Sequence, residues 1–345
     1  MRARKNGKLP PPFPKGWIPI CESDSLKKSK VLEVNAFGCN LVAWRGTSGQ
    51  SYVSDGYCPH LGAHLGVGSS VSGECIKCPF HGWCYDGSQN GKLVHIPYAE
   101  DVPSNVSTKM WKSQEKYGLI FVWYPQNEEP SWNLEEIPEI DRDNWSFRGR
   151  IVFDTLCHIQ DIPENLADVP HLNEVHTDLS TISGDVRKSW IQRSHIRHIH
   201  TGEWSPSKKC DENHKAFMTM QHKIEIFQRF HCGYATMKAV HIGPALMLLY
   251  MSTPTGKFVI IQGLVPSREL RTRSILRIYA EPRMLQCFVK QLMDGIHNNA
   301  LRDRVIMNRK SFTDKPFLVK EDKYIKMFRR WYAQFYGETT SNDNE

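Results

Sequence analysis

The first part of the chain alternates short apolar runs with glycine-containing turns, a pattern typical of small all-β domains. Each run has the length of a strand, and the run that ends at Trp123 is apolar throughout, as expected for a buried closing strand. The expected strands lie at 31–34, 40–44, 51–53, 71–77 and 119–123. The pattern therefore predicts a barrel-like β domain over residues 16–125.

A polar, proline-rich connector begins the second domain, which we place at residues 126–345. Its middle part again has the pattern of strands. The aliphatic and methionine side chains of these strands would form either a core or the apolar wall of a cavity. The strands are expected at 217–220, 224–226, 246–251, 258–261 and 274–278.

From Pro282 the apolar positions recur every three or four residues, which predicts a long amphipathic helix. The segment 328–336 then carries five aromatic side chains, and we expect it to dock on the second domain. The apolar helical face comprises Leu285, Phe288, Val289, Leu292, Ile296, Ala300 and Val305. A sheet followed by helices predicts an α+β fold for this domain.

Positive charge is concentrated at the start of the chain. The net charge is +7, and the first 30 residues hold eight Lys or Arg against two acids. Because the remainder is nearly neutral, we expect no nucleic-acid groove. Residues 1–15 surround the proline-rich run 10–14, so they form either a stiff stalk at an anionic membrane surface or a disordered tail. No apolar run reaches the ~18–20 residues that span a bilayer.

Two Cys/His pairs are the strongest chemical signal. Cys58 and His60 form the first pair, and Cys78 and His81 form the second pair after 17 intervening residues. Two thiolates and two imidazoles on two short loops suit a [2Fe-2S] cluster of the Rieske type, in which imidazoles replace two thiolates and raise the reduction potential. A cluster held by thiolates, with only ten cysteines in 345 residues, indicates a reducing compartment rather than a disulfide framework.

A structural zinc site is the alternative for this region. The spacing of Cys75, Cys78 and His81 could form a zinc knuckle, and Cys84 follows closely. The Cys-x-His spacing of the first pair is poor for zinc, whereas nearby glycines would let backbone N–H groups approach bridging sulfides. These glycines are Gly62, Gly66, Gly68 and Gly82. On the cluster interpretation, Cys75 and Cys84 are small buried apolar residues.

A second metal site is predicted around residues 168–176. Pro170 cannot occupy a helix interior, so Asp168 is expected to cap a helix that begins just after it. His171 and His176 converge only if this helix ends or bulges between them. Two histidines and one carboxylate make the facial triad of a non-haem iron oxygenase, and Asp294 and Asp303 are both candidates for the carboxylate.

Chance is the alternative for this second site, because the chain holds fifteen histidines. Another group, His195, His198 and His200, alternates with apolar residues. We interpret that group as the polar face of a strand rather than as ligands.

Together these residues resemble the Rieske non-haem iron oxygenases over residues 16–336. In that family the Asp-x-x-His-x4-His pattern supplies a bridging aspartate and two iron ligands, here Asp168, His171 and His176. The family's third ligand corresponds best to Asp303, with Asp294 in reserve. The Pro-Lys-Gly-Trp start, residues 163–165 and the aromatic ending are most similar to the Neverland group of animal cholesterol 7-desaturases, relatives of bacterial 3-ketosteroid 9α-hydroxylases.

The resemblance implies a Rieske domain followed by a helix-grip catalytic domain, assembled as a homotrimer. The cluster of one subunit would face the iron of its neighbour, with Asp168 bridging His81 and His171. The reaction would use O2, and NAD(P)H-derived electrons would come from a separate reductase or ferredoxin, because no Gly-x-Gly-x-x-Gly motif follows a strand here.

The implied reaction is conversion of cholesterol to 7-dehydrocholesterol. Hydroxylation or demethylation of another steroid or hydrophobic substrate is the first alternative. A non-catalytic electron carrier or a zinc-stabilised binding protein is a remote one. The resemblance also implies association with the cytosolic side of the endoplasmic reticulum membrane.

Overall fold

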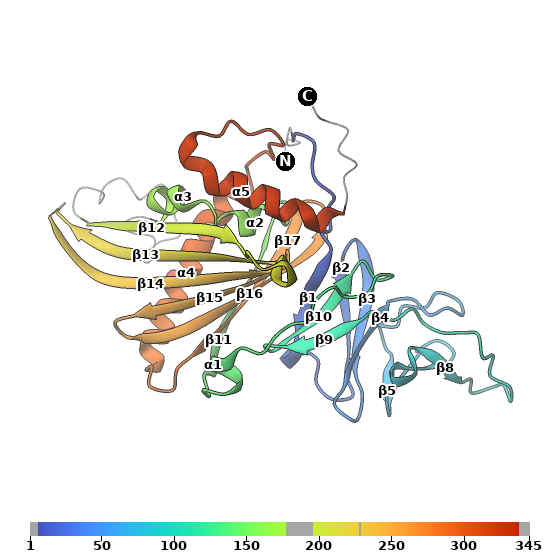
Figure 1. The fold of residues 1–345 in the computed structure, drawn as a ribbon. Coiled ribbons are helices and arrows are strands. Elements are labelled where there is room, and N and C mark those ends of the chain that lie inside the picture. Colours follow the sequence, from blue (N-terminus) through green and yellow to red (C-terminus); the bar gives the residue numbers. More distant parts are fainter. Residues whose placement is uncertain (1–5, 177–195, 228, 338–345) are drawn as a thin grey trace. The chain divides into compact units, whose positions relative to one another are not determined.

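The computed structural model describes residues 6–176, 196–227 and 229–337, which belong to two compact units (Figure 1). One unit is Trp17–Leu134, and the other combines the chain up to Gly16 with the chain from Glu135 onward. The Trp17–Leu134 unit is built from strands alone, apart from short 3-10 turns, and the second unit contains one large sheet and several helices. The predicted α+β class, with the β domain first, is confirmed.

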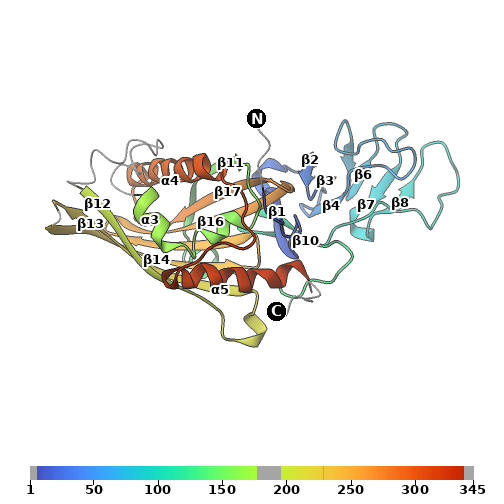
Figure 2. The same cartoon turned by 90° about the horizontal axis from the view of Figure 1, so that it is seen from above.

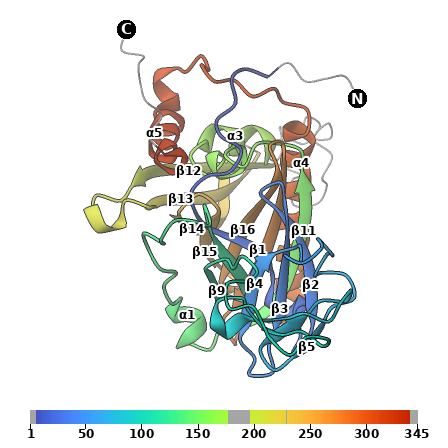
Figure 3. The ribbon, with the colours of Figure 1, turned by 90° about the vertical axis from the view of Figure 1, so that its right-hand side faces the viewer.

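The unit Trp17–Leu134 contains three small antiparallel sheets (Figure 3). The first sheet has the order β1-β10-β9, the second β2-β3-β4 and the third β5-β6-β7-β8. The strands are β1 (Gly16–Glu22), β2 (Val31–Ala36), β3 (Cys39–Arg45), β4 (Ser51–Asp55), β5 (Ser70–Ser72), β6 (Cys75–Lys77), β7 (Cys84–Asp86), β8 (Lys92–His95), β9 (Ser113–Lys116) and β10 (Leu119–Tyr124). Trp17, Trp44 and Trp123 are buried in it, so the apolar run that ends at Trp123 is indeed an interior strand.

One predicted strand of this unit was wrong. The run 71–77 forms a hairpin, β5 and β6, in which Ser72 pairs with Cys75. Gly73 has a φ of +60° at the turn, a conformation that glycine adopts without steric cost. The apolar residues Val71 and Ile76 face each other across this hairpin, because the turn between them reverses the chain.

The second unit contains a seven-stranded antiparallel sheet in the order β11-β17-β16-β15-β14-β13-β12. Because consecutive strands from β12 to β17 are neighbours, β12 lies at one edge and β11 at the other. The strands are β11 (Ser146–Thr155), β12 (Ile196–Pro206), β13 (Lys215–Ile226), β14 (Phe230–Ile242), β15 (Leu246–Thr253), β16 (Gly256–Arg268) and β17 (Arg271–Ala280). All five strand runs predicted for residues 217–278 lie within these strands.

The helices of this unit are α1 (Pro138–Asp141), α2 (Asp161–Glu164), α3 (Val169–Val175), α4 (Gln286–Met307) and α5 (Lys323–Tyr332). Helix α3 lies between α4 and α5 (Figures 2 and 3). The long helix predicted after Pro282 is α4, and Val289, Leu292 and Ile296 pack on the sheet as expected. Leu285, Phe288 and Val305 are exceptions, because all three are exposed. Leu285 also precedes the helix as its N-cap.

Strand register defines the face of the sheet on which α4 and α5 pack. Trp204 pairs with Met218, which continues the row through Ala239 and Leu249 to Ile260 and Ile278. Phe328 and Trp331 of α5 contact Trp204 at one end of this row, and α4 covers Ile260 and Ile278 at the other. We call this side the inner face. Three methionines, Met218, Met220 and Met237, are buried on the inner face, and Met220 pairs with Met237 across β13 and β14.

The proline-rich segment is neither a free stalk nor a disordered tail where it is described. Gly7 N–H donates to the Phe312 carbonyl, and Lys15 N–H donates to the Phe335 carbonyl. The Pro11 carbonyl also bonds His158 Nε2 at 3.2 Å. Residues 6–15 are therefore part of the second unit. Among the described residues, no helix is both long and apolar enough to cross a membrane.

The aromatic tail docks as predicted, through α5 and the turn after it. Phe328, Tyr332 and Phe335 are buried, and Tyr332 Oη donates to the Pro244 carbonyl at 3.0 Å.

We expect Phe328→Ala to lower the unfolding free energy by about 3–5 kcal/mol, because it leaves a cavity among packed rings. Denaturant unfolding would measure this loss. The control Phe317→Ala, at a side chain that is 96% exposed, should change stability by less than ~0.5 kcal/mol. Equal effects of the two substitutions would contradict the docking.

Candidate metal centres

The two Cys/His loops have the same backbone geometry. Both have the sequence Cys-Pro-x-x-Gly, and in each the glycine N–H donates to the cysteine carbonyl four residues earlier. Each cysteine N–H in turn donates to the carbonyl five residues later, in Ala63 and Trp83. Gly62 and Gly82 have φ values of +71° and +74°, which favour glycine. The repeated motif therefore produces two matching ligand loops.

The loops direct their thiols inward and their imidazoles outward. Cys58 and Cys78 are each only 3% exposed and belong to the same apolar core cluster. The rings of His60 and His81 lie 4.7 Å apart between centroids and are half-buried, and His60 stacks on Trp83 at 4.3 Å. Two adjacent buried thiols beside two adjacent imidazoles fit the ligand set of a Rieske [2Fe-2S] cluster.

Tyr85 is a neighbour of this group that sequence analysis missed. Its hydroxyl lies 3.1 Å from Cys58 Sγ. Burial raises the pKa of the Cys58 thiol, and the hydrogen bond from Tyr85 acts in the opposite direction. A hydroxyl at a ligand sulfur is the kind of contact that adjusts a cluster's potential. Tyr85 is adjacent to Cys84, but nothing in the sequence pattern distinguished it from a core tyrosine.

The zinc-knuckle alternative has no support in the described residues. The one group of side chains there that could surround a single ion is elsewhere, and Cys75, Cys78 and His81 do not form such a group. Burial raises the pKa of Cys75 to about 11 and also raises the pKa of Cys84. Cys84 is buried and Cys75 is half-buried.

The second centre begins with α3, which has the predicted ends. Asp168 caps it, since its carboxylate accepts a hydrogen bond of 3.2 Å from His171 N–H. The helix ends at Val175, and His176 is the C-cap with non-helical dihedral angles. This end of the helix turns His176 towards His171, so that their ring centroids lie 5.4 Å apart.

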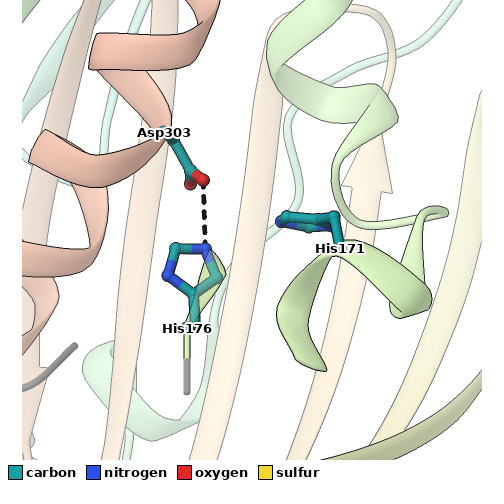
Figure 4. Close-up of side chains that lie close together, drawn as sticks. All are labelled: His171, His176 and Asp303. Carbon is teal, nitrogen blue, oxygen red and sulfur yellow. Dashed lines mark ion pairs between the residues drawn. The ribbon is translucent and has the colours of Figure 1, made fainter. Parts of the chain in front are cut away.

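Asp303 of α4 completes a three-residue group (Figure 4). Its Oδ1 lies 3.1 Å from His176 Nε2, and one ligand atom from each of His171, His176 and Asp303 lies within 4.8 Å of the others. Asp294 is exposed. It precedes Asp303 by nine residues, which is about half a turn away around the helix. The structure therefore brings Asp303, and not Asp294, to the two histidines.

The electrostatics of this group suit a metal ion. Burial lowers the pKa of His171, so its imidazole is neutral at neutral pH and keeps a lone pair for coordination. His176 is buried, and its Nδ1 has no hydrogen-bond partner in the described part of the chain. Two imidazoles and one carboxylate fit an Fe(II) site with open positions.

Asp168 lies beside this group without bonding the His171 ring through its carboxylate. Its Oδ2 is 4.0 Å from His171 Nδ1, and that nitrogen instead bonds the Asp168 carbonyl oxygen. The Asp168 side chain is 29% exposed. The carboxylate is thus within reach of solvent or of another protein surface on one side and close to His171 on the other.

Three histidines of the inner face lie close to the group. His200 is paired with His222 across the strands, and His198 Nδ1 lies 2.8 Å from His222 Nε2. Burial lowers the pKa of His200 to about 3 and that of His222 to about 4, so both are neutral. The prediction of a strand is confirmed for His198 and His200, whereas His195 lies outside the described residues.

Comparison with known proteins agrees with this geometry. Residues 16–106 match the Rieske [2Fe-2S] domain, and residues 122–336 match the C-terminal domain of 3-ketosteroid 9α-hydroxylase. Two solved structures share the fold at 16% identity. NdmA of Pseudomonas putida CBB5 with caffeine has a TM-score of 0.68 over 93% of this chain and 90% of that one. The structure of dicamba monooxygenase bound to dicamba has a TM-score of 0.67 over 94% of this chain and 98% of that one.

Curated relatives extend over nearly the whole chain. The cholesterol 7-desaturase of Bombyx mori is 36% identical over 340 residues, covering 97% of this chain and 72% of that protein. The Drosophila melanogaster enzyme of the same name is 35% identical over 348 residues, with coverage of 99% and 79%. The oxygenase component of 3-ketosteroid-9-alpha-monooxygenase from Mycobacterium tuberculosis is 28% identical over 349 residues, with coverage of 96% and 83%.

The fold and the two domain matches define the class of protein, an oxidoreductase with a Rieske domain. The chain belongs to the Rieske oxygenases, and its second part has the C-terminal domain of 3-ketosteroid 9α-hydroxylase. The predicted family is confirmed.

Proposed function

We propose that this chain is the oxygenase of a sterol desaturase system that removes two hydrogens from C7 and C8 of cholesterol. The observation that carries this proposal is the group His171, His176 and Asp303, formed by α3 and α4 in a chain that also has a Rieske domain. The names of the relatives with 35–36% identity support a sterol as substrate. The methionines of the inner face are consistent with an apolar substrate.

We assign Cys58, His60, Cys78 and His81 as ligands of the [2Fe-2S] cluster, and His171, His176 and Asp303 as ligands of mononuclear Fe(II). When bound, the iron would supply O2 activation and the cluster would supply single electrons. In balance, the two substrate hydrogens and two electrons with two protons convert O2 into two waters, and one NAD(P)H provides the electron pair.

A separate NAD(P)H-dependent reductase or a ferredoxin would provide these electrons. Ferredoxin-type donors have potentials near −400 mV, and Rieske centres begin at about −150 mV. A gap of ~250 mV makes each transfer favourable by roughly 6 kcal/mol. The relative from Mycobacterium tuberculosis is named as an oxygenase component, which supports a separate donor.

A homotrimer, in which Asp168 links His81 of one subunit to His171 of the next, remains part of the proposal. The outward position of the His60 and His81 rings is consistent with it, as is the partial exposure of Asp168. Association with the endoplasmic reticulum membrane stays a prediction.

The test is reconstitution of the purified chain with Fe(II), a ferredoxin and its reductase, NAD(P)H and cholesterol. We expect three irons for every two acid-labile sulfides, and a product two mass units lighter than cholesterol. A product sixteen mass units heavier would favour a monooxygenase, as the name of the Mycobacterium tuberculosis relative suggests. If the protein reconstituted with Fe(II) holds only two irons for two sulfides, this would support a non-catalytic electron carrier. Zinc in place of iron would overturn both redox proposals.

A further inference from the structure

Helix α3 carries both histidines of the candidate iron site, although it is too short to be stable by itself. It spans Val169–Val175, with His171 in its first turn and His176 directly after its end. Isolated helices shorter than ~12–15 residues are marginal in water. The spacing between the two imidazoles therefore depends on the contacts that hold α3 in place.

Asn173 provides a two-point contact of this kind. Its Nδ2 donates to the His200 carbonyl at 3.0 Å, and its Oδ1 accepts from His200 N–H at 2.7 Å. One carboxamide thus bonds both backbone groups of a single residue. This is the pattern that an adjacent antiparallel strand would make, and a side-chain amide has the same donor and acceptor as a peptide group.

The position of His200 explains why such a partner is needed. Strand β12 is the edge strand of the sheet, with β13 as its one strand neighbour in the described order. Edge strands present N–H and C=O groups that require other partners when they are covered. His200 is half-buried and pairs with His222 of β13. Because the N–H and C=O of one residue point to the same side of an antiparallel strand, the two His200 groups that bond Asn173 face away from β13.

A second contact holds the other side of α3. Arg302 of α4 is fully buried, and its Nη1 donates to the Val175 carbonyl at 2.8 Å. Asp303 is the next residue in the chain. Helix α3 is therefore fastened to β12 through Asn173 and to α4 through Val175, and both contacts fall between His171 and His176.

From this geometry we infer that Asn173 is a positioning residue of the mononuclear iron centre. Its carboxamide takes the place of a neighbouring strand at His200 and fixes the distance of the two ligand histidines from Asp303. The inference rests on the proposed iron site. It assigns a role to a residue that is not one of the three proposed iron ligands.

Asn173→Leu is the sharpest test, because leucine has nearly the same shape and makes neither hydrogen bond. We expect the apparent affinity for Fe(II) to fall about 10–100-fold, as for other residues that orient metal ligands. The measured ratio of iron to acid-labile sulfide should fall from three to two towards two to two. The Rieske cluster, in the other unit, serves as an internal standard for the amount of intact protein.

A spectroscopic measurement separates positioning from simple stability. The EPR spectrum of the ferrous nitrosyl complex reports the symmetry of the mononuclear site, and we expect its rhombicity to change in Asn173→Leu at saturating Fe(II). Asn173→Asp keeps the acceptor for His200 N–H and loses the donor, so its affinity should lie between those of Asn173→Leu and the unaltered chain. If Asn173→Leu does not accumulate as protein with an intact cluster, the Asn173→Asp variant alone tests the role of Asn173.

Thr272→Val is the matched control. Thr272 is buried in the same unit, and its hydroxyl donates to the Cys157 carbonyl at 3.2 Å. This substitution also removes a side-chain to backbone hydrogen bond at constant shape, and it should lower stability without changing Fe(II) affinity.

The possible outcomes separate a failure of the positioning role from a failure of the proposed function. If the unaltered chain holds a third iron and Asn173→Leu binds Fe(II) with the same affinity and spectrum, the role of Asn173 is overturned while the proposed function stands. If the unaltered chain holds no third iron, the proposed function itself fails and the inference fails with it.

Discussion

Asp303→Ala should remove the mononuclear iron and abolish desaturation, while the [2Fe-2S] cluster stays in place. Asp303 contributes the only carboxylate of the three-residue group, and its Oδ1 lies 3.1 Å from His176 Nε2. Without it, two imidazoles alone would have to hold a hard divalent ion. Turnover should fall by more than about 100-fold, since even residues that merely orient a ligand are worth 10–100-fold. Iron and sulfide analysis, together with product detection, measures both effects.

The chain provides a control for this substitution on the same helix. Asp294→Ala removes an identical side chain nine residues earlier, where it is exposed. We expect full iron content and unchanged turnover for this variant. If Asp294→Ala loses the third iron and Asp303→Ala retains it, the assignment of the ligand is reversed.

Asp168→Asn should leave both metal centres loaded and slow electron transfer between them by about 100-fold or more. Asparagine is as good an N-cap as aspartate, so α3 and its two histidines should keep their positions. The substitution removes the charge next to His171 Nδ1 and replaces one acceptor oxygen by a donor. A carboxylate that accepts from imidazole N–H groups can couple proton position to redox state, and an amide can do so far less.

Single-turnover measurements separate this effect from damage to the iron site. The protein is reduced until the cluster absorbance bleaches, and O2 is then added in the presence of sterol. We expect slow reoxidation of the cluster in Asp168→Asn, with an unaltered nitrosyl spectrum of the mononuclear iron. Reoxidation and turnover at the rate of the unaltered chain would rule out Asp168 as the link between the centres.

The local parts of both sites could be predicted because short-range rules determine them. The two Cys-Pro-x-x-Gly loops need only glycine at a positive φ and a hydrogen bond four residues back. Helix α3 has the capping Asp168 shortly before a proline. The four residues between His171 and His176 mean that both imidazoles can converge only if the helix ends near His176, as it does. In these segments the residue types and their spacing are sufficient to specify the geometry.

Contacts between residues far apart in the chain could not be predicted from residue types and spacing. Asp294 and Asp303 are chemically equivalent candidates. Apart from the family resemblance, which favours Asp303, only the side of α4 that faces α3 distinguishes them. The pairing of Asn173 with His200 joins residues 27 positions apart across a sheet edge, for which no periodicity gives a signal. The run 71–77 was predicted as one strand because its apolar residues Val71 and Ile76 suit either one strand or two. The chain reverses direction at Gly73, which has a positive φ.

The hydrogen bonds of residues 6–15 have a consequence for how this chain can be divided. Since Gly7 and Lys15 bond to Phe312 and Phe335, the second unit is made of two separate stretches, and the unit Trp17–Leu134 is inserted between them. A fragment that simply starts after the β domain would lack one of those stretches and would leave the Phe312 and Phe335 carbonyls without their partners in it. A variant in which a short flexible linker joins Gly16 directly to Glu135 would keep both stretches, and we expect it to fold as the second unit alone.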